Sequence, residues 1–170
     1  MAAPIDIRLE FQEDVTAGLR RGIAAGLDMT PAMQEIARHL ETATAMHFEQ
    51  ERGPGGVAWK PSERAIAEGG QTLTMSGDLR SSISSTFGPD FAAAGPERSF
   101  GAAVYAAIHQ FGGTIRAKAG RALSFGGRLF AAVRIPARAY LGIDDQDRAA
   151  IADILRGFFG RAFAGAGGGE

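Results

Sequence analysis

The chain has 170 residues, no cysteine, and 18 basic residues against 19 acidic ones, for a net charge of −1. That length suits a single domain with a substantial core, and the lack of cysteine excludes disulfides, thiolate catalysis and metal sites built on cysteine. No apolar run reaches the roughly 20 residues of a membrane-spanning helix, and no secretory signal is visible, so a soluble cytoplasmic product is expected.

The charge is distributed unevenly along the chain. Residues 1–97 hold 14 acids and 8 bases, residues 98–143 hold 7 bases and no acid, and residues 144–170 hold 5 acids and 3 bases. A long segment of one sign attracts nucleic acid or an acidic partner, but its cations can equally pair with the acids of residues 1–97. Five cations of the middle segment are candidates for a basic patch: Arg116, Lys118, Arg121, Arg128 and Arg134.

The first half of the chain is predicted to be mainly helical. Residues 4–12 alternate apolar and polar side chains, which predicts a strand, and residues 13–27 favour a short helix weakened by glycines. The clearest helix covers residues 30–50, where Thr30 is expected to cap a helix that begins with proline. Its predicted buried stripe consists of Met33, Ile36, Ala37, Leu40, Thr44, His47 and Phe48.

Short elements are expected in the middle of the chain. Residues 62–70 favour a brief helical piece, and Ser76 or Asp78 is expected to cap a short turn. Residues 81–87 and 91–95 predict two short strands around a Gly-Pro turn.

A helix and a hairpin follow. Residues 101–111 predict a short helix that ends at two glycines. Residues 122–125 and 128–134 flank Gly126-Gly127, a two-residue signal for a tight β-hairpin. Pro136 is expected to end the second strand, because proline cannot donate to the ladder.

A last helix, capped by Asp144 or Asp145, completes the predicted fold. The sum is an α+β fold with an antiparallel sheet packed by a long helix of the N-terminal half and a C-terminal helix. We expect one domain over residues 1–163, including an N-terminal extension over residues 1–27, followed by a flexible glycine-rich tail over residues 164–170.

The chain offers little for catalysis or cofactor binding. His39 and His47 are eight residues apart and lack the spacing of a zinc motif, so both are expected to pack at the edge of the helix stripe. His109 has no accompanying nucleophile elbow, and Trp59 occupies the position where a phosphate-binding loop needs glycine. No enzyme, metal or cofactor is therefore expected, and a hydrolase around His109 is the weakest hypothesis.

Four motifs, in order, resemble one known family. They are FEQERGPGGVAWKPS at residues 48–62, LTMSGDLRSSI at 73–83, YAAIHQFGG at 105–113 and IPARAYLGI at 135–143. Together they are similar to the virion morphogenesis, or tail completion, proteins of Mu-like and P2-like tailed phages and prophages. The resemblance covers about residues 30–160.

This resemblance implies a structural virion protein at the head–tail junction, made in the host bacterial cytoplasm. It implies a hexameric ring of identical subunits that meets other neck, tail tube and tail terminator proteins and contacts phage DNA in the channel. Two alternatives remain: a tail terminator that caps the tail tube, and a small DNA-binding protein that uses residues 98–143.

Six residues are candidates for structural or interface roles. Trp59 is expected to anchor the loop after the long helix into the sheet, and Arg138, with Tyr140 nearby, to reach a neighbouring subunit. Three side chains are expected to form a polar cluster that holds the following glycine turn: Tyr105, His109 and Gln110. Each can equally serve packing within the chain.

Overall fold

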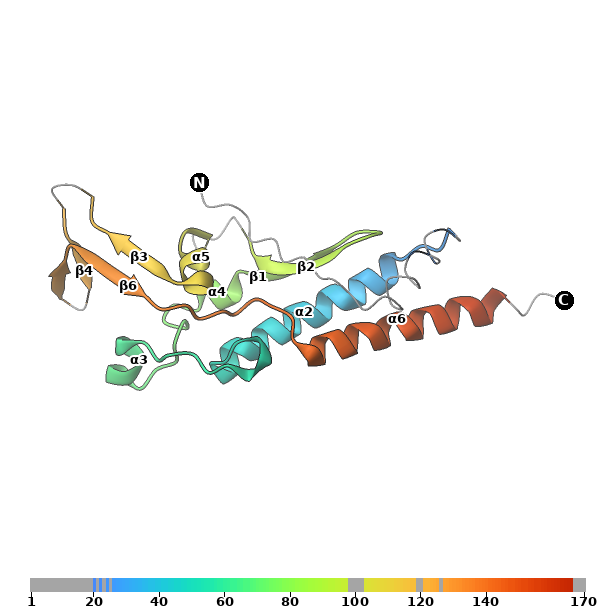
Figure 1. The fold of residues 1–170 in the computed structure, drawn as a ribbon, viewed down its shortest axis with the longest axis horizontal. Coiled ribbons are helices and arrows are strands. Elements are labelled where there is room, and N and C mark those ends of the chain that lie inside the picture. The colour runs from blue at the N-terminus through green and yellow to red at the C-terminus, as the bar shows by residue number, and fades with distance from the viewer. Residues whose placement is uncertain are drawn as a thin grey trace.

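The computed structural model describes residues 20, 22, 24, 26–97, 103–118, 121–125 and 127–166. The predicted strand over residues 4–12 and most of the predicted helix over residues 13–27 lie outside these residues. The described chain is elongated: two long helices and a β-ribbon form a body, and a second set of strands extends from one end (Figure 1).

The long predicted helix is confirmed as α2 (Thr30–Gln50). The predicted cap is wrong, because Met29 occupies the N-cap position and Thr30 is already helical. The Thr30 N–H instead binds the carboxylate of Asp28, at 3.0 Å. The predicted stripe is buried except for His47, which is half-buried: Ala32, Met33, Ile36, Ala37, Leu40, Thr44 and Phe48 line the buried face.

The second long helix is α6 (Asp145–Ala166), which packs along α2 (Figure 1). Ile151 and Leu155 of α6 are buried in one apolar cluster with Met29, Met33 and Ile36. This apolar seam joins the two halves of the chain and makes up much of the body's core. α6 includes residues 164–166 of the expected glycine-rich tail, and residues 167–170 lie outside the described chain.

The two middle strands are β1 (Ile83–Phe87) and β2 (Ala92–Pro96), which form an antiparallel ribbon on α2. Ala92 and Ala94 pack against the apolar cluster between the helices. Small side chains let the ribbon approach the helix closely. α2 therefore lies between the β1–β2 ribbon and α6 (Figure 1).

Short helices connect α2 to this ribbon: η1 (Pro54–Gly56), α3 (Glu63–Glu68) and α4 (Asp78–Ser81). The Ser62 hydroxyl caps α3 by accepting the Ala65 N–H at 3.1 Å. Gly77 occupies the N-cap position of α4 and has no side chain, and the expected capping residue Ser76 lies one position earlier, where its hydroxyl accepts the Asp78 N–H at 3.4 Å. A positive φ of 80° at Gly77 explains the glycine.

After α5 (Ala103–Phe111), four short strands form an arm, defined here as residues 113–118, 121–125 and 127–135. The strands are β3 (Gly113–Arg116), β4 (Leu123–Phe125), β5 (Arg128–Phe130) and β6 (Ala132–Ile135). The predicted hairpin is confirmed as β4–β5, but the predicted strand over residues 128–134 is divided at Ala131, so that β6 pairs with β3. β6 ends before Pro136, as expected.

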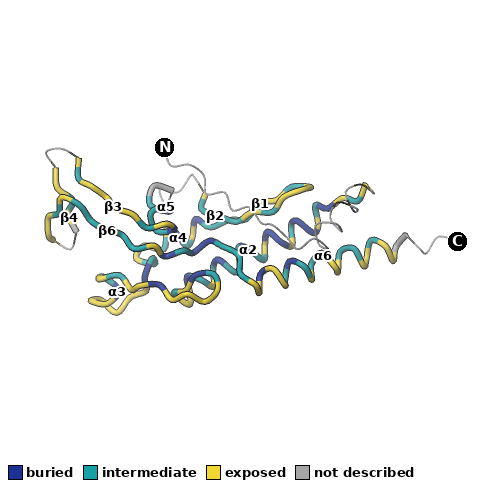
Figure 2. Tube along the Cα trace, in the orientation of Figure 1, coloured by how far each residue is buried: buried dark blue, intermediate teal, exposed yellow. Residues whose placement is uncertain are grey.

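The α+β fold class is confirmed, and its β structure is divided among small antiparallel sheets rather than joined in one. Among the described residues these are three two-stranded sheets, β1–β2, β3–β6 and β4–β5. Burial is concentrated along α2 and the segment that follows β6, whereas the arm is mostly exposed or half-buried (Figure 2). No helix of the described chain is long and apolar enough to cross a membrane.

Candidate assembly surface

The segment between β6 and α6, residues 136–144, crosses the body. It contains or binds most of the structural candidates, namely Trp59, Gln110, Arg138 and Tyr140. Gln110 of α5 holds it with three hydrogen bonds: its Oε1 accepts the Tyr140 and Leu141 N–H groups, each at 3.0 Å, and its Nε2 donates to the Leu141 carbonyl at 2.7 Å. Gln110 is buried, so these bonds satisfy backbone groups that water cannot reach.

Tyr140 is the largest fully buried side chain of this segment. Its ring packs on Phe48 of α2 with centroids 5.3 Å apart, and its hydroxyl donates to the Ala106 carbonyl at 3.3 Å. Burial raises the pKa of the Tyr140 phenol well above its usual range. Tyr140 therefore serves the interior of this chain and is not exposed for an interface.

Trp59 fixes the loop after α2 to the same segment. Its Nε1–H donates to the Ala139 carbonyl at 2.9 Å, and its ring meets Phe48 edge to face at 5.5 Å. A Cβ at Gly53 would lie 2.5 Å from the same carbonyl oxygen, so this close approach requires glycine. Trp59 was expected to anchor the loop into a sheet, whereas it anchors it to α2 and to residues 136–144.

Arg138 is also used within the chain. Its side chain is 6% exposed, and its Nε donates to the Lys60 carbonyl at 2.6 Å. The expectation that Arg138 reaches a neighbouring subunit therefore does not fit this structure, because the guanidinium is directed into its own chain. Burial lowers the pKa of this guanidinium from its ordinary value.

Tyr105, His109 and Gln110 do not form the expected polar cluster. No hydrogen bond joins any two of these three described residues: Gln110 binds residues 140–141, whereas the Tyr105 and His109 rings meet edge to face at 6.0 Å. Their helix places Gln110 toward the buried segment and Tyr105 and His109 on an adjacent face, four residues apart. The turn after α5 instead depends on Gly112, where φ is 70° and a Cβ would lie 2.7 Å from the Ala137 nitrogen.

His109 is half-buried, and its ring packs within the chain. Burial, and secondly the Arg138 guanidinium, lower its pKa, so the ring is favoured in its neutral form. Its Nδ1 is buried and has no hydrogen-bond partner among the described residues. The Arg138 N–H binds the His109 backbone carbonyl at 2.7 Å, which fixes the residue by its main chain.

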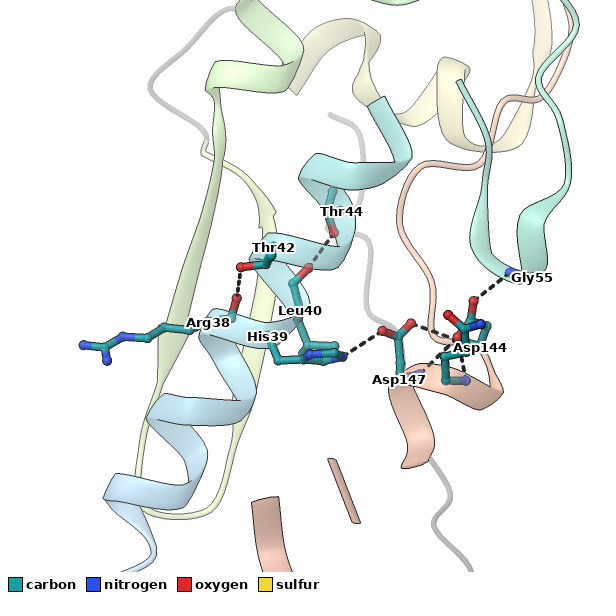
Figure 3. A network of polar contacts seen from close by, with 9 residues as sticks. Arg38, His39, Leu40, Thr42, Thr44, Gly55, Asp144 and Asp147 are labelled. Atoms are coloured by element: carbon teal, nitrogen blue, oxygen red, sulfur yellow. Dashed lines mark hydrogen bonds and ion pairs between the residues drawn. The ribbon is translucent and has the colours of Figure 1, made fainter. Parts of the chain in front are cut away.

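A polar network between α2 and α6 was missed by the sequence interpretation (Figure 3). His39 Nε2 donates to Asp147 Oδ1 at 2.8 Å, and Asp147 Oδ2 accepts the Asp144 N–H at 3.1 Å. Asp144 in return accepts the Asp147 and Gly55 N–H groups, each at 3.0 Å. The spacing of Asp144 and Asp147 is that of a capping box, a signal that the sequence contains.

These backbone hydrogen bonds, first from Asp147 and then from Gly55, hold the pKa of Asp144 below its usual range. The predicted cap at Asp144 is thus confirmed, since its carboxylate accepts the Gln146 and Asp147 N–H groups of the first turn of α6. The same carboxylate also ties the η1 loop to this helix start.

The basic candidates lie together on the arm and are all exposed: Arg116, Lys118, Arg121, Arg128 and Arg134. In the β3–β6 register, Thr114 faces Arg134 and Arg116 faces Ala132, so the two arginines share one face of the ribbon. The Arg128 guanidinium lies 5.9 Å from the centre of the Phe130 ring. None of the five forms an ion pair with a described residue, so pairing with acids of the body is not seen in this part of the chain.

The described residues contain no group of three or more histidine, aspartate or glutamate side chains that could hold a metal ion. Among the described residues, the buried polar side chains other than His109 bind backbone groups, cap helices or join helices. Of the described residues, those of the arm are mostly exposed or half-buried.

Comparisons with known proteins show the family of the chain. The family model of the phage virion morphogenesis family matches residues 11–159. The Mu-like prophage FluMu G protein 2 of Haemophilus influenzae is 34% identical over 155 residues, which cover 91% of this chain and 96% of that protein. The putative capsid assembly protein G of Escherichia phage Mu is 32% identical over 130 residues, covering 71% and 73%. No solved structure matches.

By these matches the chain belongs to the phage virion morphogenesis family, and its relatives named above come from a Mu-like prophage and from phage Mu.

Proposed function

We propose that this chain is a structural protein of the phage head–tail junction, where it completes the tail or neck so that head and tail join. In this proposal it works as a ring of identical subunits, without catalysis, and meets other neck, tail tube and terminator proteins. The family membership supports a role in building the virion. The observation that carries the proposal is the uncovered arm, which leaves a charged and apolar surface open for other subunits.

Deletion of the gene from its phage or prophage tests this role. We expect DNA-filled heads and separate tails in electron micrographs, and a loss of infectious particles that the wild-type gene restores. Joined, infectious particles from the deletion would contradict the proposal. Aberrant or missing heads would instead indicate a role in building the capsid, and tails of irregular length would indicate a tail terminator.

A second candidate function is DNA binding by the arm, favoured by its five exposed cations. Phosphate contacts weaken steeply with salt, so binding to a duplex should fall strongly as salt rises. Fluorescence anisotropy with a labelled duplex measures this. Replacement of Arg116, Arg121 and Arg128 by alanine should abolish binding, and retained binding would exclude the arm as the DNA surface.

A further inference from the structure

The arm is unusual because, in the part of the chain that the structure describes, its ribbon extends from one end of the body and stays exposed or half-buried (Figure 1). All four residues of β3 are exposed, and the ribbon's two faces carry different side chains: Arg116 and Arg134 on one, Ile115 and Val133 on the other. A two-stranded ribbon of this kind is marginally stable alone in water. The arm therefore has the properties of an element that is completed by a partner.

The partner is better matched by a protein than by a nucleic acid. Leu129 is 73% exposed and Phe111, at the base of the arm, is 65% exposed, and Ile115 is also exposed. A duplex presents mainly phosphates to a cationic surface, and its apolar contacts are confined to base edges within the grooves. A protein surface with both acids and apolar groups can bury both kinds of side chain.

The chain itself carries such a surface, which we call the loop surface and define as residues 57–78. Its exposed apolar side chains are Val57, Ile66 and Met75, the last two 72% and 77% exposed. Its exposed acids are Glu63, Glu68 and Asp78. Arg64 Nη2 donates to the Gln71 carbonyl at 2.6 Å, so the backbone beneath these side chains is held in place.

The charges of the two regions are opposite in sign. The arm carries five cations and no acid, whereas the loop surface carries three acids against two bases, Lys60 and Arg64, and Arg64 pairs with Glu68 at 3.4 Å. The loop surface and the arm lie at the same end of the molecule, yet no hydrogen bond or ion pair among the described residues joins them within the chain (Figure 1).

We propose that the arm of one copy docks on the loop surface of a second copy, with the cations against the acids and Leu129 of the β4–β5 hairpin against the exposed apolar side chains. This contact rests on the proposed function, since it supplies the subunit interface of the proposed ring. It joins two different patches, so it is heterologous and each copy offers one arm and one loop surface. Repetition of such a contact produces a closed ring or an open filament.

Charge reversal in pairs tests this contact by light scattering after size exclusion. The wild-type chain should associate at about 0.05 M salt and weaken at about 0.5 M, because exposed charge pairs are screened. R116E/R134E in the arm, and E63K/E68K in the loop surface, should each raise the concentration needed for association about 100-fold, since like charges then face one another. R38E/R161E, with the same change of charge on exposed arginines of α2 and α6, should associate as the wild type does.

Mixing the two reversed proteins gives the decisive result. The reversed arm of one protein then matches the reversed loop surface of the other. An equal mixture should therefore associate although neither protein does so alone. A wild-type chain that stays monomeric at high concentration and low salt, or a mixture that stays monomeric, overturns the proposal. Arm reversal that abolishes binding to a DNA duplex without changing the mass also overturns it, in favour of a nucleic-acid surface.

The lack of cysteine permits an independent test by cross-linking. A protein with both Leu129→Cys and Ile66→Cys should form a ladder of multimers under oxidation, seen on a denaturing gel without reductant. The control pairs Leu129→Cys with Met46→Cys, an exposed position on α2, and should give no ladder. If neither pair gives a ladder while the gene deletion still separates heads from tails, this interface is wrong and the proposed function stands. A ladder with joined particles contradicts the proposed function alone.

Discussion

Many side chains of the helical body are packed and hydrogen-bonded within the chain, whereas many side chains of the arm are exposed to solvent. In the body, Phe48 packs against Trp59 and Tyr140, and buried Gln110 binds the backbone of the segment across it. In the arm, cations and large apolar side chains lie open to water and no ion pair with a described residue is formed. The two regions belong to one chain but differ in how far their side chains are covered.

This difference separates side chains that stabilise the fold from side chains that stay available to a partner. A side chain buried in the body contributes to the free energy of unfolding through packing and hydrogen bonds. An exposed side chain on the arm contributes little to that free energy until a partner covers it. Substitutions in the two regions should therefore separate folding from association.

The largest expected effect is the replacement of Phe48, which is fully buried between Trp59 and Tyr140. Phe48→Ala leaves a cavity that the two remaining rings, Trp59 and Tyr140, cannot close. It should therefore lower the free energy of unfolding by about 3–5 kcal/mol. Urea denaturation followed by circular dichroism measures this. Leu129→Ala in the arm is the matched control, expected within about 0.5 kcal/mol at high salt. An equal loss of unfolding free energy in both variants would contradict the proposed difference between body and arm.

Gln110→Leu should have the next largest effect. It keeps the approximate size of the side chain but leaves two N–H groups and one carbonyl of residues 140–141 without partners. Buried unsatisfied groups are costly, so the free energy of unfolding should fall by about 1–3 kcal/mol. Gln50→Leu, on the exposed last turn of α2, is the control and should be nearly neutral. A neutral result for Gln110→Leu would show that water reaches this segment.

Asp144→Ala tests the cap that joins α6 to the η1 loop. Loss of an N-cap side chain should cost about 1 kcal/mol at neutral pH. Because its folded pKa is below the ordinary value near 3.8, the unfolded chain binds more protons in this range. The carboxylate's contribution is therefore present above pH 4 and is lost as pH falls through the folded pKa.

The corresponding measurement is the unfolding free energy of both proteins between about pH 3 and pH 7. The difference between wild type and Asp144→Ala should shrink toward the acid end. Asp145→Ala is the control, since that carboxylate is fully exposed and only faces Arg148 at 3.9 Å. A difference that is constant with pH would show that the Asp144 charge is not what stabilises the helix start.

Sequence patterns predicted the helices well because periodicity and capping are local. Residues 30–50 and the final helix follow their apolar stripes, and the two glycines after residue 111 end α5. The division of the predicted strand at Ala131 was not predictable, because it depends on which distant strand each half meets. Strand pairing is a non-local property, and the pattern of single residues does not contain it.

The site was predicted less completely. The exposure of the five arm cations agrees with a basic patch, but Arg138 belongs to the same basic segment and is buried against Lys60. Charge alone does not distinguish these two environments. Some apolar residues of the loop surface, such as Ile66, are exposed in the structure. The periodicity of apolar residues does not predict this exposure, so it is known only from the fold.

The smallest effect on folding is expected from Arg116→Ala with Arg134→Ala. The two guanidiniums share one face of the β3–β6 ribbon at diagonal positions, where like charges repel weakly. At high salt the double variant should unfold within about 0.5 kcal/mol of wild type, and without salt it should gain slightly, because the repulsion is removed. Urea denaturation at both salt concentrations measures this. A loss well beyond this range would mean that the arginines support the arm itself, and arm variants could then no longer separate folding from association.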